Sequence, residues 1–225
     1  MSLAIVFGGG GVRGAFQAGV WAEIGSYLQP DFVIGSSIGA INAWATTRLT
    51  PTALADWWEH RVPNHLWPRQ TQPLRQLISA ISAQPAAKPW PALAVATRLR
   101  ARRSHVVTLT ETNAAAWLLA SAAMPGWFSP QRIDHHLFVD GGVANDLPVA
   151  IARDLGATKI LAVSALGLGP TPAIGDVPVL YPPKHTGAMF DFSLKHRQIL
   201  LQAGHQAGQA WLQSRDAQSF LASSY

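Results

Sequence analysis

The 225-residue sequence contains no cysteine. Disulfide frameworks, thiolate metal sites and cysteine nucleophiles are therefore excluded, and a catalytic nucleophile has to be a serine, threonine, lysine or carboxylate. No apolar stretch approaches the ~20 residues of a membrane-spanning helix. The apolar segment Leu3 to Phe7 is too short for a signal-peptide core and lacks a basic lead. We expect a protein that is cytoplasmic or peripheral to a membrane.

Acidic residues are missing from the whole segment between His60 and Thr110 of this chain, whose net charge is +5. Its basic residues are Arg61, Arg69, Arg75, Lys88, Arg98, Arg100, Arg102 and Arg103. The segment is either a solvated basic face or a surface that attracts anionic lipid or another acidic partner. The period-two spacing of Arg98, Arg100 and Arg102 predicts one side of a strand or hairpin arm. Because no aromatic residues interleave with these arginines, we expect no nucleic-acid binding.

Short apolar runs alternate with longer helix-compatible stretches, and 48% of the residues are hydrophobic. This alternation predicts a single α/β domain over residues 1–225, with three α/β/α layers and a largely parallel sheet. The expected strands are Leu3 to Phe7, Asp31 to Ile34, Leu93 to Leu99, Ser104 to Leu109, His136 to Val139 and Lys159 to Ala165. The expected helices are Val12 to Leu28, Ile38 to Arg48, Pro51 to Arg61, Pro73 to Ser82, Thr112 to Ala123, Leu147 to Leu155 and Leu194 to Ser214.

A proline- and tryptophan-rich stretch from Pro63 to Pro91 interrupts the alternation of strands and helices. It predicts an insertion over the sheet, at about residues 56–92, that could form a lid. A second proline- and glycine-rich loop runs from Leu166 to Pro183.

The segment Gly35-Ser36-Ser37-Ile38-Gly39 follows an apolar strand and precedes a helix-forming stretch. In the G-x-S-x-G pattern, Gly35 and Gly39 are needed because the strand and the helix come too close for a Cβ. The turn presents Ser37 at the carboxyl end of the strand and at a helix N-terminus, which favours developing negative charge. The alternative is a serine that only caps the helix.

Glycines from Gly8 to Gly11, followed by Val12-Arg13-Gly14, connect the first strand to a helix. Such a loop points consecutive N–H groups at an anion. A dinucleotide site would need an acidic residue at the end of the second strand, and a Walker-type loop would need a Lys-Ser/Thr pair; both are missing. The remaining functional interpretation is an oxyanion hole formed by the N–H groups of Gly9, Gly10 and Gly11. Arg13 is a second positive element or, as we favour, a brace for the loop.

A serine nucleophile needs a base. His185, His196 and His205 lie late enough in the chain for a Ser-Asp-His triad, but none follows a strand in a short loop. Asp140 ends an apolar strand and is followed by Gly141 and Gly142, which let the chain turn away. A desolvated Asp140 could accept the Ser37 proton directly, although an ordinary Asp-Gly turn would look the same.

Three features together resemble the patatin-like phospholipase family, as a short bacterial-type member. They are the glycine loop with Arg13-Gly14, the turn at residues 35–39 that presents Ser37, which we call the elbow, and the Asp140-Gly141-Gly142 turn. Residues 120–130 and 145–149 are also similar to the family's segments around the catalytic strand. The resemblance implies a Ser37–Asp140 dyad without histidine, an oxyanion hole at Gly9 to Gly11, and no cofactor or metal. It covers about residues 3 to 165. The chain departs from the family where Arg98 follows Ala96-Thr97 and in the tryptophan-rich region from Trp57 to Trp90.

The resemblance implies a lipid acyl hydrolase, with a fatty-acyl ester or phospholipid as substrate and peripheral contact with an anionic membrane. Two alternatives stay open. One is a non-catalytic protein that binds lipid or acyl groups, and the other is a histidine-dependent esterase or thioesterase of the α/β-hydrolase type. Acyl length, head group and oligomeric state are not predicted.

Overall fold

The computed structural model describes residues 2–66, 68–172 and 174–222 and is built on an eight-stranded sheet. The strands are β1 (Leu3–Phe7), β2 (Phe32–Ser36), β3 (Ala92–Arg98), β4 (Arg103–Thr108), β5 (Gln131–Ile133), β6 (His136–Asp140), β7 (Lys159–Val163) and β8 (Val179–Leu180). Their order is β5-β6-β3-β2-β1-β7-β8, with β4 also paired to β3. The pairs among β3, β2, β1, β7 and β8 are parallel, whereas β4, β5 and β6 pair antiparallel. The prediction of a mostly parallel sheet is confirmed.

Strand β3 brings two other strands end to end. Its pairing with β4 spans residues 93–98, so β4 occupies one edge of β3. On the opposite edge, β2 pairs with residues 92–95 and β6 pairs with residues 96–98. Because β2 and β6 run in opposite directions along this edge, their carboxyl ends meet: Ser36 pairs with Val95, and Asp140 pairs with Ala96.

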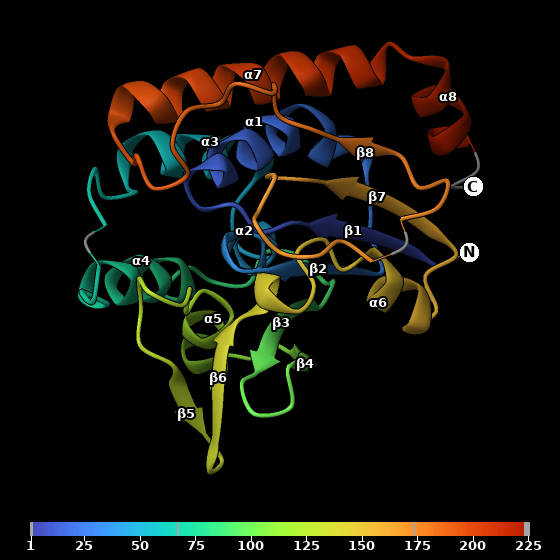
Figure 1. Ribbon diagram of the computed structural model, residues 1–225. Helices are drawn as coiled ribbons and strands as arrows, with labels where there is room; N and C mark the ends of the chain where they lie inside the picture. The colour runs from blue at the N-terminus through green and yellow to red at the C-terminus, as the bar shows by residue number, and fades with distance from the viewer. Residues whose placement is uncertain (1, 67, 173, 223–225) are drawn as a thin grey trace.

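The helices lie on both faces of the sheet, in the predicted α/β/α order. They are α1 (Gly14–Ile24), α2 (Ile38–Thr46), α3 (Pro51–His60), α4 (Gln72–Ser82), α5 (Ala114–Ser121), α6 (Val149–Asp154), α7 (Leu194–Leu212) and α8 (Arg215–Ala222), with short 3-10 turns η1 (Gly11–Arg13), η2 (Gly25–Tyr27) and η3 (Gly141–Val143). Helices α1, α3 and α7 stack on one face, and α6 covers part of the other (Figure 1). The described helices include none that is long and apolar enough to cross a membrane.

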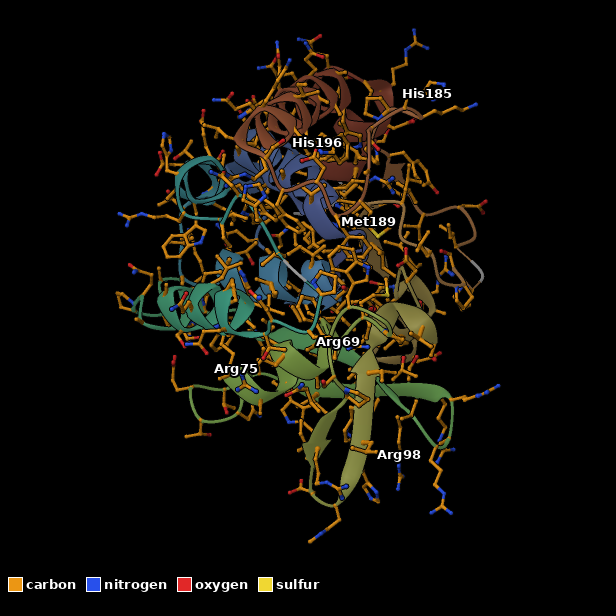
Figure 2. The ribbon with its side chains drawn as sticks, turned by 60° about the vertical axis from the view of Figure 1, so that its left-hand side comes forward. Arg69, Arg75, Arg98, His185, Met189 and His196 are labelled. Atoms are coloured by element: carbon orange, nitrogen blue, oxygen red, sulfur yellow. The ribbon has the colours of Figure 1, made fainter. Side chains whose placement is uncertain are left out.

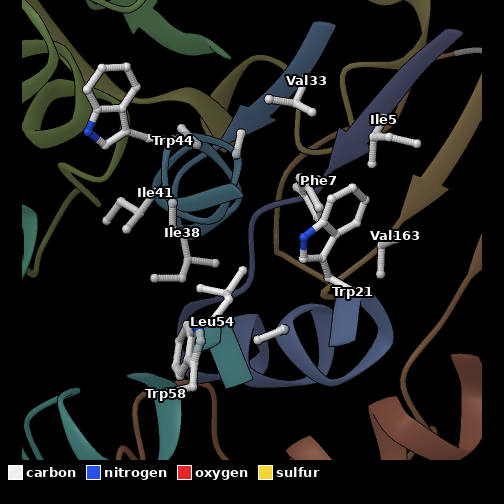
Figure 3. Packing of buried hydrophobic residues seen from close by; sticks show 14 of the residues in the cluster. Ile5, Phe7, Trp21, Val33, Ile38, Ile41, Trp44, Leu54, Trp58 and Val163 are labelled. Atoms are coloured by element: carbon white, nitrogen blue, oxygen red, sulfur yellow. The ribbon is translucent and has the colours of Figure 1, made fainter. Parts of the chain in front are cut away.

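Alternate strand residues divide the core between the two faces. Ile5, Phe7, Val33 and Val163 belong to one cluster with Trp21 of α1, and Figure 3 shows Phe7 and Val163 beside this tryptophan. The neighbouring strand residues point to a smaller cluster formed with α6 and the segment around residues 174–179. Burial on both faces explains why the parallel strands are continuously apolar.

The predicted elements are found, with boundaries shifted by a few residues. Strands β5 and β8 and helix α8 were not predicted. The interpretation of the arginine series is corrected: Arg98 ends β3, whereas Arg100 and Arg102 lie in the turn before β4, so the three do not share one side of a strand. The tight turn, in which Arg102 has a φ of 49°, replaces the extended arm that period two would need.

The segment expected to be an insertion, residues 56–92, is partly built into the core. Trp58 of α3 is buried and donates a hydrogen bond from Nε1 to Oδ1 of Asn42. Leu77 and Ile78 of α4 also belong to the main cluster. A lid function for this segment stays a prediction. The part that could form the lid is the connection between α3 and α4, which contains Leu66.

Candidate active site

Ser37 forms the turn between β2 and α2. Its φ of 56° is disfavoured for residues that carry a side chain. A Cβ at Gly35 would overlap the backbone of Gly39, and a Cβ at Gly39 would overlap the carbonyl of Phe7. Strand and helix therefore approach as closely as the G-x-S-x-G pattern predicts, and the turn holds the serine at the carboxyl edge of the sheet.

Contacts from other segments hold the elbow in place. The N–H of Ser37 donates to Oγ of Ser121, at 2.9 Å, and the Ser121 hydroxyl donates to the carbonyl of Val95, at 2.6 Å. The hydroxyl of Ser36 donates to the carbonyl of Asn145, at 2.6 Å. These bonds connect the elbow to α5, to β3 and to the chain after η3.

Asp140 faces the serine from the end of β6. The Ser37 hydroxyl donates to Oδ2 of Asp140 at 2.5 Å, and the Gly142 N–H donates to Oδ1 at 2.8 Å. The carboxyl group is buried, with 1% of the residue exposed. Burial raises the pKa of Asp140 to about 6, although the hydrogen bonds from Ser37 and Gly142 lower it. Asp140 is therefore mostly ionised at neutral pH and has more affinity for a proton than an exposed aspartate.

The glycine-rich loop lies beside the elbow. The Gly8 N–H donates to the carbonyl of Val163 and the Gly9 N–H to the carbonyl of Asp146. Within the described part of the chain, the N–H groups of Gly10 and Gly11 have no hydrogen-bond acceptor, and both glycines line the cavity at Ser37. Gly11 has a φ of 58°, and a Cβ there would overlap the Met189 backbone. Gly9 also lines the cavity, but its N–H is already occupied.

Two polar side chains hold this loop. Arg13 donates to the carbonyls of Leu166, at 2.7 Å, and Gly187, at 3.2 Å, so it connects the loop to two later segments. Gln17 is fully buried and donates to the carbonyls of Gly8 and Val163. These contacts hold the loop, and a role of Arg13 as a brace stays a prediction.

The cavity that contains Ser37 has a volume of about 260 Å³. Besides the glycines and two aspartates, Asp140 and Asp146, its walls are mainly apolar. The apolar lining includes Ile38, Ile41, Leu66, Leu74, Ala122, Met124, Phe128, Val143, Leu168, Met189, Phe190 and Phe192. These residues come from α2, from α4 and the chain before it, from the segment after α5, from η3, and from the loops after β7 and before α7, so segments far apart in the sequence form the walls.

The histidines considered as bases lie elsewhere. Among the described residues, no histidine lines the cavity. Figure 2 shows His185 and His196 on the side of the molecule where α7 lies. Nδ1 of His196 lies 2.8 Å from the Asp191 carbonyl, and Nδ1 of His205 lies 2.7 Å from Glu23 Oε1. His196 and His205 therefore have structural contacts on α7 that do not involve Ser37.

Two groups at the site had no predicted role. Ser121 holds the Ser37 N–H, and Asp146 places a second buried carboxyl group in the cavity. Both lie in segments that the sequence resemblance included, but no short motif marks either one. Their roles depend on contacts between distant segments.

The sequence matches a known protein family. The patatin-like phospholipase profile matches residues 5–88 and 72–153, together more than half of the chain. Patatin-like phospholipase domain-containing protein 7 of Mus musculus is 27% identical over 186 residues, covering 72% of this chain and 13% of its own length. Neuropathy target esterase sws of Drosophila melanogaster is 29% identical over 188 residues, with the same two shares. The chain thus spans about an eighth of these relatives' length.

A solved structure shows the same fold. VipD from Legionella pneumophila superposes with a TM-score of 0.55 at 11% sequence identity, covering 94% of this chain and 66% of its own. The likeness at this identity concerns the fold alone, and the profile match concerns the sequence. On the profile match, the chain belongs to the patatin-like phospholipase family.

Proposed function

We propose that this protein is a serine acyl hydrolase that cleaves fatty-acyl esters, with Ser37 as nucleophile and Asp140 as base. The observation that carries the proposal is the 2.5 Å hydrogen bond from the Ser37 hydroxyl to a buried carboxylate. Family membership and the names of its relatives, a phospholipase and an esterase, support lipid esters as the substrate class.

The reaction would proceed by acyl transfer. Asp140 accepts the hydroxyl proton while Ser37 Oγ bonds to the ester carbonyl carbon, and the carbonyl oxygen becomes an oxyanion. The N–H groups of Gly10 and Gly11 are free to donate to this oxyanion, and the N–H of Ile38, at the start of α2, adds a donor. The leaving alcohol takes the proton from Asp140. Water then attacks the acyl-enzyme and restores the serine.

The cavity supports an acyl chain as the part of the substrate that is bound. Its volume of about 260 Å³ is below the roughly 300–1,000 Å³ of typical ligand pockets, and most of its walls are apolar. We infer that it holds one acyl chain of moderate length while the rest of the lipid stays outside. The exposed Leu168 and Val143 at its lining would contact that remainder.

Turnover of short- and long-chain esters and of phospholipids tests the dyad. We expect Ser37→Ala and Asp140→Asn each to lower kcat/KM by at least about 10³-fold, as for other members of a nucleophile–base unit. His185→Ala and His205→Ala are the controls and should leave turnover unchanged. Full activity of either dyad variant, or its loss in a histidine variant, would contradict the proposal in favour of a histidine-dependent hydrolase.

A protein that only binds acyl groups is the alternative from another class. It would retain lipid binding in wild type and in Ser37→Ala and would turn over no ester in the panel. The strained conformation of Ser37 favours the enzyme, because such strain commonly accompanies catalytic groups and a binding pocket has no need of it.

A further inference from the structure

The cavity contains a carboxyl group that acyl transfer by Ser37 and Asp140 does not use. Asp146 is 4% exposed and lies after the turn that follows Asp140. Its N–H donates to the Pro170 carbonyl, its carbonyl accepts the Gly9 N–H, and its Oδ2 accepts the Gly167 N–H at 3.1 Å. Its Oδ1 has no hydrogen-bond partner in the part of the chain that the structure describes. The N–H, the carbonyl and Oδ2 of Asp146 thus form hydrogen bonds to neighbouring loops, and Oδ1 remains available for a hydrogen bond to a bound substrate.

Oδ1 of Asp146 lies between the glycine-rich loop and the dyad. The position that a Cβ would take at Gly9 is 2.7 Å from this oxygen and 3.3 Å from Cβ of Ser37. The corresponding position at Gly142 is 3.0 Å from Oδ1 of Asp146 and 3.0 Å from Oδ1 of Asp140. The oxygen therefore borders the small space where an ester bound to Ser37 would react.

Few charges act on Asp146 from the elements packed against it. Asp140 is the charged group on the side of β6 and η3. Residues 165–170 contain only Ala, Leu, Gly and Pro, and Arg13 of the glycine-rich loop donates to carbonyls of other residues. Burial and then the charge of Asp140 raise the pKa of Asp146 to about 7, against the effect of the Gly167 N–H. A neutral Asp146 also avoids placing two carboxylates and an oxyanion in one apolar cavity.

We propose that Asp146 is a third catalytic residue, a neutral carboxylic acid whose Oδ1–H donates a hydrogen bond to the substrate oxygen that becomes the oxyanion. The inference rests on the acyl hydrolase function proposed above. Because Oδ2 already accepts the Gly167 N–H, the acid proton belongs on Oδ1, the oxygen that borders the cavity. The active form of the enzyme then combines an ionised Asp140 with a protonated Asp146.

The dependence of kcat/KM on pH tests this role. We expect a bell-shaped profile for wild type, with an acid limb near pH 6 from Asp140 and an alkaline limb near pH 7 from Asp146. Asp146→Asn keeps a neutral donor at this position, so it should retain activity within a few-fold at pH 6 and lose the alkaline limb. Asp146→Ala removes the donor and should lower kcat/KM at least about 10-fold at pH 6, where Asp146 of the wild type is protonated, and less above pH 7.

Controls separate a catalytic role from a structural one. Asp154→Asn changes an exposed carboxylate on α6 and should leave the profile as in wild type. Gly167→Ala keeps the carboxyl group of Asp146, but the added Cβ would overlap this group and displace it, so activity at pH 6 should fall as in Asp146→Ala. Carbon-13 spectra of labelled aspartates in Ser37→Ala should show a carboxyl resonance that titrates near pH 7 and is missing when Asp146→Asn is added.

Two results would overturn the proposal while leaving the hydrolase intact. One is an alkaline limb that persists in Asp146→Asn, and the other is equal activity of Asp146→Ala and Asp146→Asn at pH 6. By contrast, a wild-type protein that hydrolyses no ester, while its Asp146 carboxyl still titrates near pH 7, would contradict the proposed function itself.

Discussion

Asp140 shows how burial and hydrogen bonding oppose each other at the residue scale. Burial favours its neutral form, whereas the Ser37 hydroxyl and the Gly142 N–H donate to its oxygens and favour the anion. The resulting pKa of about 6 keeps it ionised at neutral pH but close enough to neutrality to take up a proton. A weakly perturbed aspartate would be a poorer base for a hydroxyl.

The raised pKa of Asp140 also predicts a pH-dependent cost in stability. Its folded value of about 6 exceeds the ordinary value of about 3.9, so the folded state loses stability as pH rises through this interval. Asp140→Asn lacks this loss. Its free energy of unfolding relative to wild type should therefore increase by about 2 kcal/mol between pH 4.5 and pH 8.

Urea unfolding at the two pH values measures this change. The exposed Asp154→Asn is the control and should show the same small difference from wild type at both. A stability difference for Asp140→Asn that is equal at pH 4.5 and pH 8 would show that the folded carboxyl group has an ordinary pKa.

The residues that could be predicted at the site are those under local backbone constraints. Gly35 and Gly39 flank Ser37 because their own turn leaves no space for a Cβ, and this requirement is visible in five consecutive residues. Asp146 and Ser121 could not be assigned roles, since these depend on bonds to Gly167 and Ser37, far away in the sequence. The occupied N–H of Gly9 is a similar long-range contact.

At the scale of the elements, strand β3 determines where the two halves of the dyad meet. The sequence predicts both β2 and β6 as strands, but only the pairing shows that they share one edge of β3 with their carboxyl ends together. Strands β5 and β8 have three and two residues, too short for a periodic signal. The periodicity of a strand can be recognised within a short stretch of sequence, whereas the strands with which it pairs cannot.

The walls of the cavity are also assembled from separate elements. The rings of Trp127, after α5, and Phe190, before α7, stack with centroids 3.8 Å apart. Phe190, Met124 and Phe128 all line the cavity. This stack therefore joins two of the segments that would surround an acyl chain.

Narrowing the cavity should change its preference for acyl length. Met124→Trp adds volume to the lining, so we expect kcat/KM for long-chain esters to fall at least about 10-fold while acetyl esters are cleaved within a few-fold of wild type. A series of p-nitrophenyl esters measures this ratio. Leu155→Trp, at an exposed position outside the cavity, is the matched control. Equal losses for all chain lengths would show that the acyl group binds elsewhere.

At the scale of the whole molecule, several basic side chains of the segment between His60 and Thr110 lie away from α7 and α8. In Figure 2, Arg69, Arg75 and Arg98 lie in the half of the molecule opposite His185. The turn between β3 and β4 contains Arg100 and Arg102. It projects from the carboxyl end of β3, beyond the end of β2. We propose that this half of the molecule contacts anionic lipid while Ser37 acts on a neighbouring molecule of the layer.

Vesicle binding tests this contact. Arg100→Glu combined with Arg102→Glu should weaken sedimentation with vesicles of phosphatidylcholine and phosphatidylserine, because each basic residue near the surface contributes roughly 1 kcal/mol. Lys195→Glu combined with Arg215→Glu makes the same charge change on α7 and α8 and should have little effect. Equal binding of the two double variants would contradict the proposed surface.

Covalent labelling by a fluorophosphonate tests the central claim, that Ser37 is a nucleophile activated by Asp140, most directly. Intact-protein mass spectrometry should show one adduct on wild type, located at Ser37 by peptide mapping, and none on Ser37→Ala. Asp140→Asn should react at least about 100-fold more slowly. No adduct, an adduct at another residue, or an unchanged rate in Asp140→Asn would contradict the account.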